Sequence, residues 1–205
     1  MADSSRTHRV PRSDPWQPYL QKSLNKPSNP VVTVAAKLNQ SRLNRAVDVG
    51  CGAGNDSAAL LDLGYQVAAY DGSAEAVRIC NERFASESGF CIEQDRFETY
   101  DYPEAGLVIA FSSLFFCEPE CFDLAWGNLS SAIKPGGVFV GHFLGPEDDW
   151  AQGYRLPTCP LSKARVLSLF GAFRIHTYKE QNEIGTTRLG FDKHWHTHQV
   201  LAIKR

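Results

Sequence analysis

The sequence predicts an α/β fold, a doubly wound and mostly parallel sheet of seven strands that ends in an antiparallel hairpin. Three observations support this class. Short β-branched or apolar runs alternate with segments whose apolar residues recur at helical spacing. Each crossover between successive strands takes a dozen or more residues, as parallel pairing requires, and a turn-prone stretch separates the last two strands. A length of 205 residues accommodates one such domain.

The chain is expected to begin with a flexible leader over residues 1–30, rich in proline, serine and basic residues, and to continue as one domain over residues 31–205. Apolar residues over 31–38 suit a helix that leads into this domain. Strands and helices then alternate, and Ser73 is the expected N-cap of the helix after the second strand. The predicted strands are 46–50, 66–71 and 90–95, and the predicted helices are 55–63 and 73–85.

The second half of the chain contains the centre of the sheet. The run over 106–111 is nearly all apolar, which is typical of a central strand buried on both faces. A turn is expected over the Lys-Pro-Gly-Gly sequence at 134–137, and the turn-prone stretch over 185–193 is expected to join the strands of the hairpin. The predicted helices of this half are 119–133 and 161–170, and the predicted strands are 138–143, 173–179 and 194–204.

Composition argues against several classes of protein. With 21 Lys and Arg against 23 Asp and Glu, the formal net charge is −2, whereas a dedicated nucleic-acid binder normally carries a clear basic excess. The longest apolar run, residues 106–116, is well short of the roughly 20 residues of a membrane-spanning helix. The N-terminus lacks the apolar stretch of a secretory signal, and the six cysteines are dispersed, as expected for reduced thiols. We therefore expect a cytoplasmic protein without nucleic-acid or membrane partners.

Large apolar side chains interrupt the polar leader at Trp16, Tyr19 and Leu20. Such side chains are unfavourable in a segment that never docks, so we expect them to cover a surface. Our hypothesis is that the leader closes over the ligand site as a lid, and that Trp16 and Tyr19 shape the substrate pocket. Docking of the leader on the back of the sheet is the alternative.

The segment after the first predicted strand carries the strongest functional signal. Gly50, Gly52 and Gly54 allow a tight turn and let a ligand approach the backbone, and the helix that follows offers unpaired amides at its start. Asp71 lies 21 residues after Gly50, at the end of the second strand, where a carboxylate can accept both hydroxyls of a ribose. Together these residues predict a ligand with an adenosine group, bound across the carboxyl edge of the sheet.

The glycine spacing distinguishes between two kinds of adenosine ligand. A dinucleotide fingerprint needs a third glycine at position 55, where this chain has Asn55. The G-x-G-x-G pattern, with Asp48 two positions before it, instead resembles the first motif of the class I S-adenosylmethionine-dependent methyltransferases. The IKPGGVF run over 133–139 resembles that family's turn into its fifth strand, and the resemblance extends over 46–143. Within the family the chain looks like the compact bacterial branch of tellurite-resistance-like and small-molecule methyltransferases.

The resemblance implies the strand order 3-2-1-4-5-7-6 and S-adenosyl-L-methionine as the cofactor. The three glycines would line its methionine moiety, Asp48 would lie near its amino group, and Asp71 would hold its ribose. Asp95 would accept from the adenine amino group, with Arg96 and Phe97 beside the adenine ring. The full set of expected cofactor-binding residues is Asp48, Gly50, Gly52, Gly54, Asn55, Asp71, Gly72, Ser73, Asp95, Arg96, Phe97 and Ala110.

The resemblance also bears on the methyl acceptor. The fourth strand begins with Gly106, where many family members have Asp, and it ends without a signature of amide methylation, so a small molecule is the expected acceptor. His142 lies near the end of the fifth strand, beside the expected methyl position, and is the candidate catalytic base; a structural histidine is the alternative. The apolar stretch over 114–116, directly after the fourth strand, is expected to form an apolar wall, and Phe111 and Phe115 are expected to bind the substrate. Such a wall favours a soft or readily ionised nucleophile, such as a thiol, an amine, a chalcogen oxyanion or an acidic hydroxyl.

Two further patterns are interpreted as packing rather than as metal sites. His194, His196 and His198 alternate along a predicted strand and share one face, but no fourth ligand accompanies them. Cys117 and Cys121 lack a second pair of ligands. No metal cofactor is therefore expected.

Two other functions stay open on the sequence alone. One is a methyltransferase of the same fold that acts on protein or RNA, which would need a broad basic surface or a recognition domain. The other is a non-catalytic protein that binds an adenosine cofactor, which could also be a nicotinamide cofactor. Asn55 in place of the third glycine argues against the nicotinamide version.

Overall fold

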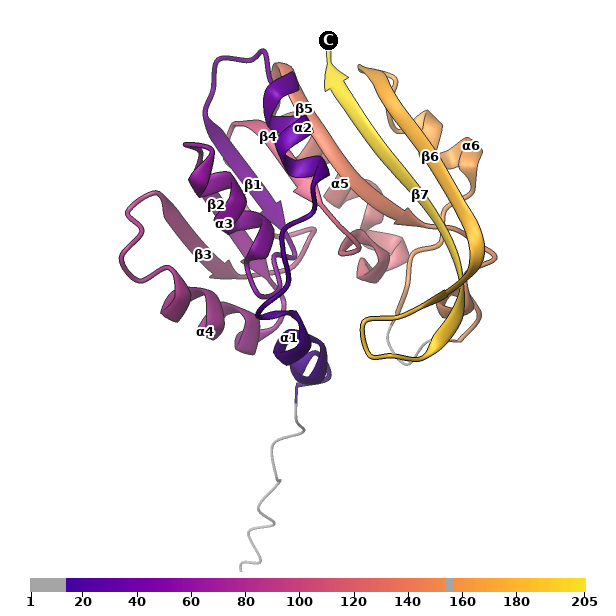
Figure 1. The fold of residues 1–205 in the computed structure, drawn as a ribbon. Helices are drawn as coiled ribbons and strands as arrows, with labels where there is room; N and C mark the ends of the chain where they lie inside the picture. Colours follow the sequence, from indigo (N-terminus) through magenta and orange to yellow (C-terminus); the bar gives the residue numbers. More distant parts are fainter. Residues whose placement is uncertain (1–13, 154–156) are drawn as a thin grey trace, which may run out of the picture.

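A computed structural model describes residues 14–153 and 157–205, so the first 13 residues of the predicted leader lie outside it. Its centre is a sheet of seven strands in the order β3-β2-β1-β4-β5-β7-β6, which confirms the predicted order (Figure 1). The first five strands pair in parallel, and β7 runs antiparallel to both β5 and β6. The strands are β1 (Arg45–Val49), β2 (Gln66–Asp71), β3 (Phe90–Gln94), β4 (Ala105–Ala110), β5 (Ile133–Leu144), β6 (Phe173–Thr186) and β7 (Asp192–Lys204).

Helices cover both faces of the sheet. They are α1 (Gln17–Ser23), α2 (Val31–Leu38), α3 (Asn55–Asp62), α4 (Ala74–Arg83), α5 (Phe122–Ala132) and α6 (Lys163–Ser168), with short 3-10 helices η1 (Leu114–Phe116), η2 (Pro119–Cys121) and η3 (Asp149–Gln152). Figure 1 shows α2 and α3 on one face of the sheet and α5 and α6 on the other. Their apolar side chains belong to the two core clusters that pack against the strands. All six residues of the central strand β4 are buried, as its apolar sequence predicts. Among the described residues, none of the helices is both long and apolar enough to cross a membrane.

Strand β5 is longer than predicted, because the expected turn over 134–137 is part of it. The strand begins at Ile133, and its register against β4 shifts between Ala105 and Leu107. Gly136 has a left-handed backbone with φ of 79°, so the extra residues form a bulge and pairing continues beyond it. The prediction of a separate turn is wrong because a bulge accommodates the same glycine-rich sequence without ending the strand.

The closing hairpin is also longer than predicted. Its turn begins at Thr187, whose amide donates to the carbonyl of Phe191 (2.8 Å). The stretch over 185–193, expected to be a turn, therefore supplies the ends of both strands. Trp195 crosses the strand pair, and its indole N–H donates to the carbonyl of Gly185 (3.2 Å). Because the glycine has no side chain, the indole can lie against the opposite strand, and this contact favours extended strands over a wide turn.

The described part of the leader, residues 14–30, contains the helix α1, which the sequence did not predict. Leu20 is 2% exposed and packs against Ala76 of α4. The helix also reaches the tip of the hairpin, where the ammonium group of Lys22 donates to the carbonyl of Leu189 (3.0 Å). Figure 1 shows α1 at the edge of the sheet where β1 and β2 end, beside α4. The leader therefore meets the edge at which the sequence places the ligand.

Candidate active site

A loop of three glycines connects β1 to α3, as predicted. Gly50, Gly52 and Gly54 have φ of 66°, 56° and 73°, in the left-handed region that other residues rarely adopt. A Cβ atom at Gly50 would lie 2.6 Å from the Cβ of Ser113, and one at Gly54 would lie 2.6 Å from the ring of Phe84. These two glycines therefore let the loop pack against the chain after β4 and against the end of α4.

Gly52 faces the leader and is held by Asp71. A Cβ atom at Gly52 would have Leu20 at 3.8 Å and Tyr19 at 4.0 Å, both on α1. The carboxylate of Asp71 accepts from two amides, through Oδ2 from Gly52 (2.8 Å) and through Oδ1 from Ser73 (2.9 Å). Each carboxylate oxygen has two lone pairs, so both can still accept a hydroxyl of a ligand. Asp71 thus lies at the predicted edge, with the loop folded around it.

Several carboxylates converge on this loop. Asp48 is buried, and its Oδ2 accepts from the hydroxyl of Ser57 (2.6 Å). Burial, followed by the negative charge of Asp56, raises the pKa of Asp48 to about 8, and burial also raises the pKa of Asp56 and of Asp71. Asp14 of the leader adds negative charge beside Asp71. A ligand that carries positive charge would relieve this repulsion. The sequence analysis did not single out either residue: Asp56 follows the loop directly, in the first turn of α3, whereas tertiary packing brings Asp14 to the site.

The residues after β4 connect the loop to a second compartment. Ser113 is buried against Gly50, and its hydroxyl has no hydrogen-bond partner among the described residues. Ser112 has φ of 56°, a strained conformation for a residue with a side chain. Its hydroxyl lies 3.2 Å from Nδ1 of His142. Of two consecutive residues, one therefore contacts the glycine loop and the other contacts an imidazole on β5.

His142 lies beside the end of β4, where the sequence places it. Burial lowers the pKa of His142 to about 4, so the imidazole is neutral at pH 7. The ring of Phe111 meets it edge to face, with centroids 5.2 Å apart. A neutral imidazole can accept a proton or a hydrogen bond, but a pKa of about 4 makes it a weak base. Its catalytic role stays a prediction.

A pocket of about 390 Å³ opens beside His142. Its floor spans β5, β7 and β6, on which His142, Gln199 and Lys179 lie opposite one another in adjacent strands. Thr197 and Gln181 form the next such pair. The lining residues are Asn29, Ser112, His142, Lys179, Gln181, Thr186, Trp195, Thr197 and Gln199. Apart from His142, the sequence did not single out these residues, although the alternation along β7 indicates a second, polar face opposite its histidines.

The sequence predicts four aromatic residues at the acceptor: Trp16, Tyr19, Phe111 and Phe115. Phe115 is fully buried. Trp16 meets the ring of Phe116 at 4.6 Å between centroids, and the guanidinium group of Arg188 lies 5.8 Å from the centroid of Tyr19. Within the described parts of the chain, none of the four lines the polar pocket. Their contact with an acceptor stays a prediction.

The predicted adenine side lies at the end of β3. Oδ1 of Asp95 accepts from the amide of Arg96 (2.7 Å), and the amide of Asp95 donates to the carbonyl of Asp71 (3.2 Å). This bond places Asp95 directly beside the predicted ribose contact. The Nε of Arg96 lies 2.7 Å from a carboxylate oxygen of Glu98, and Phe97 packs against the apolar core. Contacts of these residues with a cofactor stay predictions.

Three more predicted cofactor residues lie at the same edge. Nδ2 of Asn55 donates to the carbonyl of Ser23 (2.8 Å), and its Oδ1 accepts from the guanidinium group of Arg83 (2.6 Å). Asn55 therefore ties the glycine loop to the leader and to α4. The carbonyl of Gly72 accepts from a side-chain amide at the end of β3 (3.2 Å), and Ala110 ends the buried strand β4.

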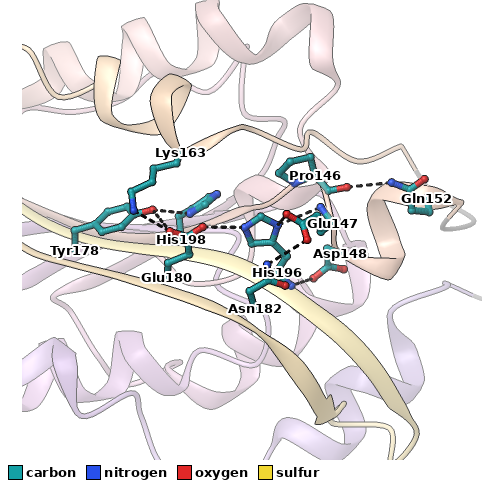
Figure 2. Close-up of polar contacts among 10 residues, drawn as sticks. All are labelled: Pro146, Glu147, Asp148, Gln152, Lys163, Tyr178, Glu180, Asn182, His196 and His198. Atoms are coloured by element: carbon teal, nitrogen blue, oxygen red, sulfur yellow. Dashed lines mark hydrogen bonds and ion pairs between the residues drawn. The ribbon is translucent and has the colours of Figure 1, made fainter.

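Two of the three histidines on β7 form a polar network with Glu180 of β6 (Figure 2). Nδ1 of His196 accepts from the amide of Glu147 (3.1 Å), so its proton lies on Nε2, which faces Glu180 at 3.3 Å. A metal ion at Nε2 would have to displace this proton from a ring whose other nitrogen is already an acceptor. Glu180 also accepts from Lys163 (3.1 Å), while His198 lies beside it within 4.8 Å. Hydrogen bonding and packing thus account for His196.

Comparisons with known proteins agree with this fold. Residues 46–137 match the family described as a methyltransferase domain. The chain is 27% identical over 142 residues to glycine N-methyltransferase of Mus musculus. The matched region covers 61% of this chain and 48% of that protein. The chain thus spans about half the length of that relative.

Solved structures with the same fold include three that share less than a fifth of their sequence with this chain. TehB from Haemophilus influenzae has a TM-score of 0.73 at 19% identity, covering 91% of this chain and 66% of that chain. Magnesium protoporphyrin IX methyltransferase from Synechocystis, with bound S-adenosylhomocysteine, has a TM-score of 0.68 at 14% identity, covering 93% and 94%. The N-methyltransferase NodS from Bradyrhizobium japonicum has a TM-score of 0.63 at 16% identity, covering 91% and 96%.

Proposed function

We propose that the chain is a class I S-adenosylmethionine-dependent methyltransferase and that it methylates a small molecule held in the pocket beside His142. S-Adenosyl-L-methionine, when bound, supplies a methyl group that is already activated on a positively charged sulfur. The protein then has to hold the two reactants in line and to keep water away from them.

The residues at the glycine loop fit this cofactor. Asp48 is buried, Asp56 and Asp71 are half-buried, and all three have raised pKa values. These carboxylates favour a ligand with a sulfonium and an ammonium group. The hydroxyl of Ser113 is buried beside the loop without a partner in the described structure, so it can bond a polar group of a ligand. Asp71 would hold the ribose hydroxyls through its free lone pairs.

The observation that carries the proposal is the junction between two compartments. Ser112 lines the pocket, while the next residue, Ser113, contacts Gly50 of the glycine loop. A molecule in the pocket therefore lies next to a ligand in the loop, which is the arrangement that transfer between two bound molecules requires. A pocket of about 390 Å³ accommodates a small molecule and not a folded macromolecule.

His142 is the proposed proton acceptor for a nucleophile that must lose a proton. Its imidazole is neutral at pH 7 and faces the pocket, and the hydroxyl of Ser112 beside Nδ1 fixes the ring. Since its pKa is about 4, the proton has to leave while the nucleophile is attacking rather than beforehand. Nucleophiles that are already ionised would not need His142.

We also propose that the leader acts as the lid of this site. Tyr19 and Leu20 of α1 lie next to Gly52, and Asn29 lines the acceptor pocket. Lys22 and Arg188 connect α1 to the hairpin tip, through a hydrogen bond to Leu189 and a cation–π contact with Tyr19. A closed leader would keep water from the sulfonium.

Two measurements test the proposed function. Calorimetric titration of the whole chain with S-adenosylmethionine, S-adenosylhomocysteine and NAD should show tight binding of the first two compounds only. Release of S-adenosylhomocysteine should then be followed with small thiols, amines and hydroxyl compounds, and with RNA and protein as alternative acceptors. Turnover of RNA or protein without turnover of any small acceptor would overturn the proposal, and NAD binding without S-adenosylmethionine binding would overturn the cofactor.

A further inference from the structure

We propose that the acceptor carries a negatively charged group, of the carboxylate kind, which Lys179 and the neighbouring side-chain amides hold at the end of the pocket away from His142. This inference rests on the proposed function, because it assigns a substrate class to the same pocket. It comes from the charge and register of the pocket floor alone.

The two ends of the pocket floor carry different chemical groups. His142 on β5 lies opposite Gln199 on β7, and Gln199 lies opposite Lys179 on β6. Neighbouring strands are about 4.8 Å apart, so the backbones at His142 and Lys179 are separated by about 10 Å. At one end of the row His142 contacts Ser112, whose neighbour Ser113 contacts the glycine loop, and the other end carries an ammonium group on a flexible stem. A bound molecule can therefore meet both ends at once.

The ammonium group of Lys179 has no counter-ion in the described structure. No hydrogen bond or ion pair of this side chain is present among the described residues, and no Asp or Glu is among the residues that line the pocket. Its chain neighbour Glu180 points to the opposite face of the hairpin, where it pairs with Lys163 and His196 (Figure 2). His142 is neutral at pH 7, so the pocket carries one formal positive charge and no negative one among its described residues.

Neutral hydrogen-bonding groups surround this charge. The side chains of Gln199 and Thr197 make no hydrogen bond within the part of the chain that the structure describes, although both line the pocket. Gln181, opposite Thr197, donates to a carboxylate oxygen of Glu183 at 3.3 Å, a weak bond that a ligand can replace. An ammonium group, amide N–H groups and a hydroxyl together suit a carboxylate, which accepts several hydrogen bonds.

The size of the pocket limits the rest of the molecule. A volume of about 390 Å³ lies at the lower end of the range for small-molecule sites. With the carboxylate at Lys179, the nucleophile would lie toward Ser112 and His142. The inferred class is a small carboxylate with an amine, thiol or hydroxyl nucleophile at its other end.

The test compares each of three carboxylates with its own uncharged amide: glycine with glycinamide, 3-mercaptopropionate with its amide, and 4-hydroxybenzoate with its amide. Binding of each compound to the S-adenosylhomocysteine-loaded protein is measured by calorimetry, and turnover is measured by release of S-adenosylhomocysteine. We expect at least one carboxylate to bind about 10- to 100-fold more tightly than its amide, the usual range for a hydrogen-bonded charge. Equal binding of the two members of every pair, or binding of neither, would overturn the inference.

Substitutions assign the preference to Lys179. Lys179→Met removes the charge and keeps the length of the side chain, so it should abolish the preference for the carboxylate and leave binding of the amide unchanged. Lys179→Arg should restore most of the preference. Lys37→Met, at an exposed lysine on α2, is the matched control and should change neither. A preference that survives in Lys179→Met would place the anion elsewhere and overturn the inference. Failure of the proposed function would instead appear as lack of S-adenosylmethionine binding, which these variants do not alter.

Discussion

Replacing Asp48 with asparagine should change the number of protons that leave the protein when S-adenosylmethionine binds. Asp48 is buried near the charges of Asp56 and Asp71, and its pKa is raised to about 8. At pH 7 a group with this pKa is about nine-tenths protonated. A sulfonium and an ammonium group beside the glycine loop favour the ionised carboxylate, so binding should expel the proton.

The size of the effect follows from the shift. If binding returned the pKa of Asp48 to its ordinary value of 3.8, about 0.9 proton would be released per cofactor at pH 7. If binding lowered the pKa only to about 7, release would be about 0.4 proton. Asp48→Asn keeps an oxygen that accepts from Ser57 and removes the titrating group, so proton release should fall by the same amount. Asp62→Asn, at an exposed position of α3, is the matched control.

The assay is calorimetric titration at pH 7 in two buffers that differ in their enthalpy of ionisation. The dependence of the binding enthalpy on the buffer gives the number of protons released. Equal release from the parent protein and from a folded Asp48→Asn variant would refute the reasoning, because the proton would then come from another group.

The same raised pKa gives a stability profile for the cofactor-free protein. Between about pH 4 and about pH 8 the folded state holds a proton on Asp48 that the unfolded chain has lost, so the free energy of unfolding falls as the pH rises through this window. Asp48→Asn should flatten this part of the profile in urea denaturation at pH 5 and pH 8. An unchanged slope would show that Asp48 does not hold the proton.

The remaining predictions concern the cofactor, the base and the leader. Asp71→Ala should weaken S-adenosylmethionine binding by about 2 kcal/mol, or about 30-fold, because two charge-assisted hydrogen bonds to the ribose are lost; unchanged affinity in calorimetry would remove the ribose assignment. His142→Ala should lower turnover about 100-fold with an alcohol or phenol and little with a thiolate, and an equal loss with both would exclude a role as base. Limited proteolysis should cut the leader more slowly when S-adenosylhomocysteine is bound, and equal rates with and without it would contradict a lid.

Local signals in the sequence were sufficient to predict which edge of the sheet carries the glycine loop. Gly50, Gly52 and Gly54 with Asp71 identify a strand, a tight turn and a carboxylate at the next strand end, and each depends on residues close in sequence. Helix and strand periodicity gave the alternation of elements for the same reason. The strand order came from the resemblance of these motifs to a family with a known fold, and it is confirmed.

Contacts between distant parts of the chain could not be predicted from local sequence signals. Asp14 and Asn29 reach the site only because α1 docks on α4 and on the loop, and a polar leader gives no period that would indicate it. Lys179 and Gln181 join the pocket through the register of a hairpin whose length was underestimated. The residues of 185–193 look like a turn in sequence, but only 187–191 form it, and cross-strand contacts such as that of Trp195 hold the flanking residues extended.

The leader segment has a thermodynamic consequence, because it contacts both compartments. Tyr19 and Leu20 lie against Gly52. Asn29 lines the pocket, and its backbone N–H donates to Oδ1 of Asp56 (2.6 Å). Ordering this segment has an entropic cost. The first ligand that binds orders the segment, so the binding free energy of the second ligand no longer includes this cost. Each ligand should therefore increase the affinity for the other by the same factor, whichever binds first. The enzyme would then select fully loaded complexes, in which the acceptor does not wait in the pocket without a methyl donor.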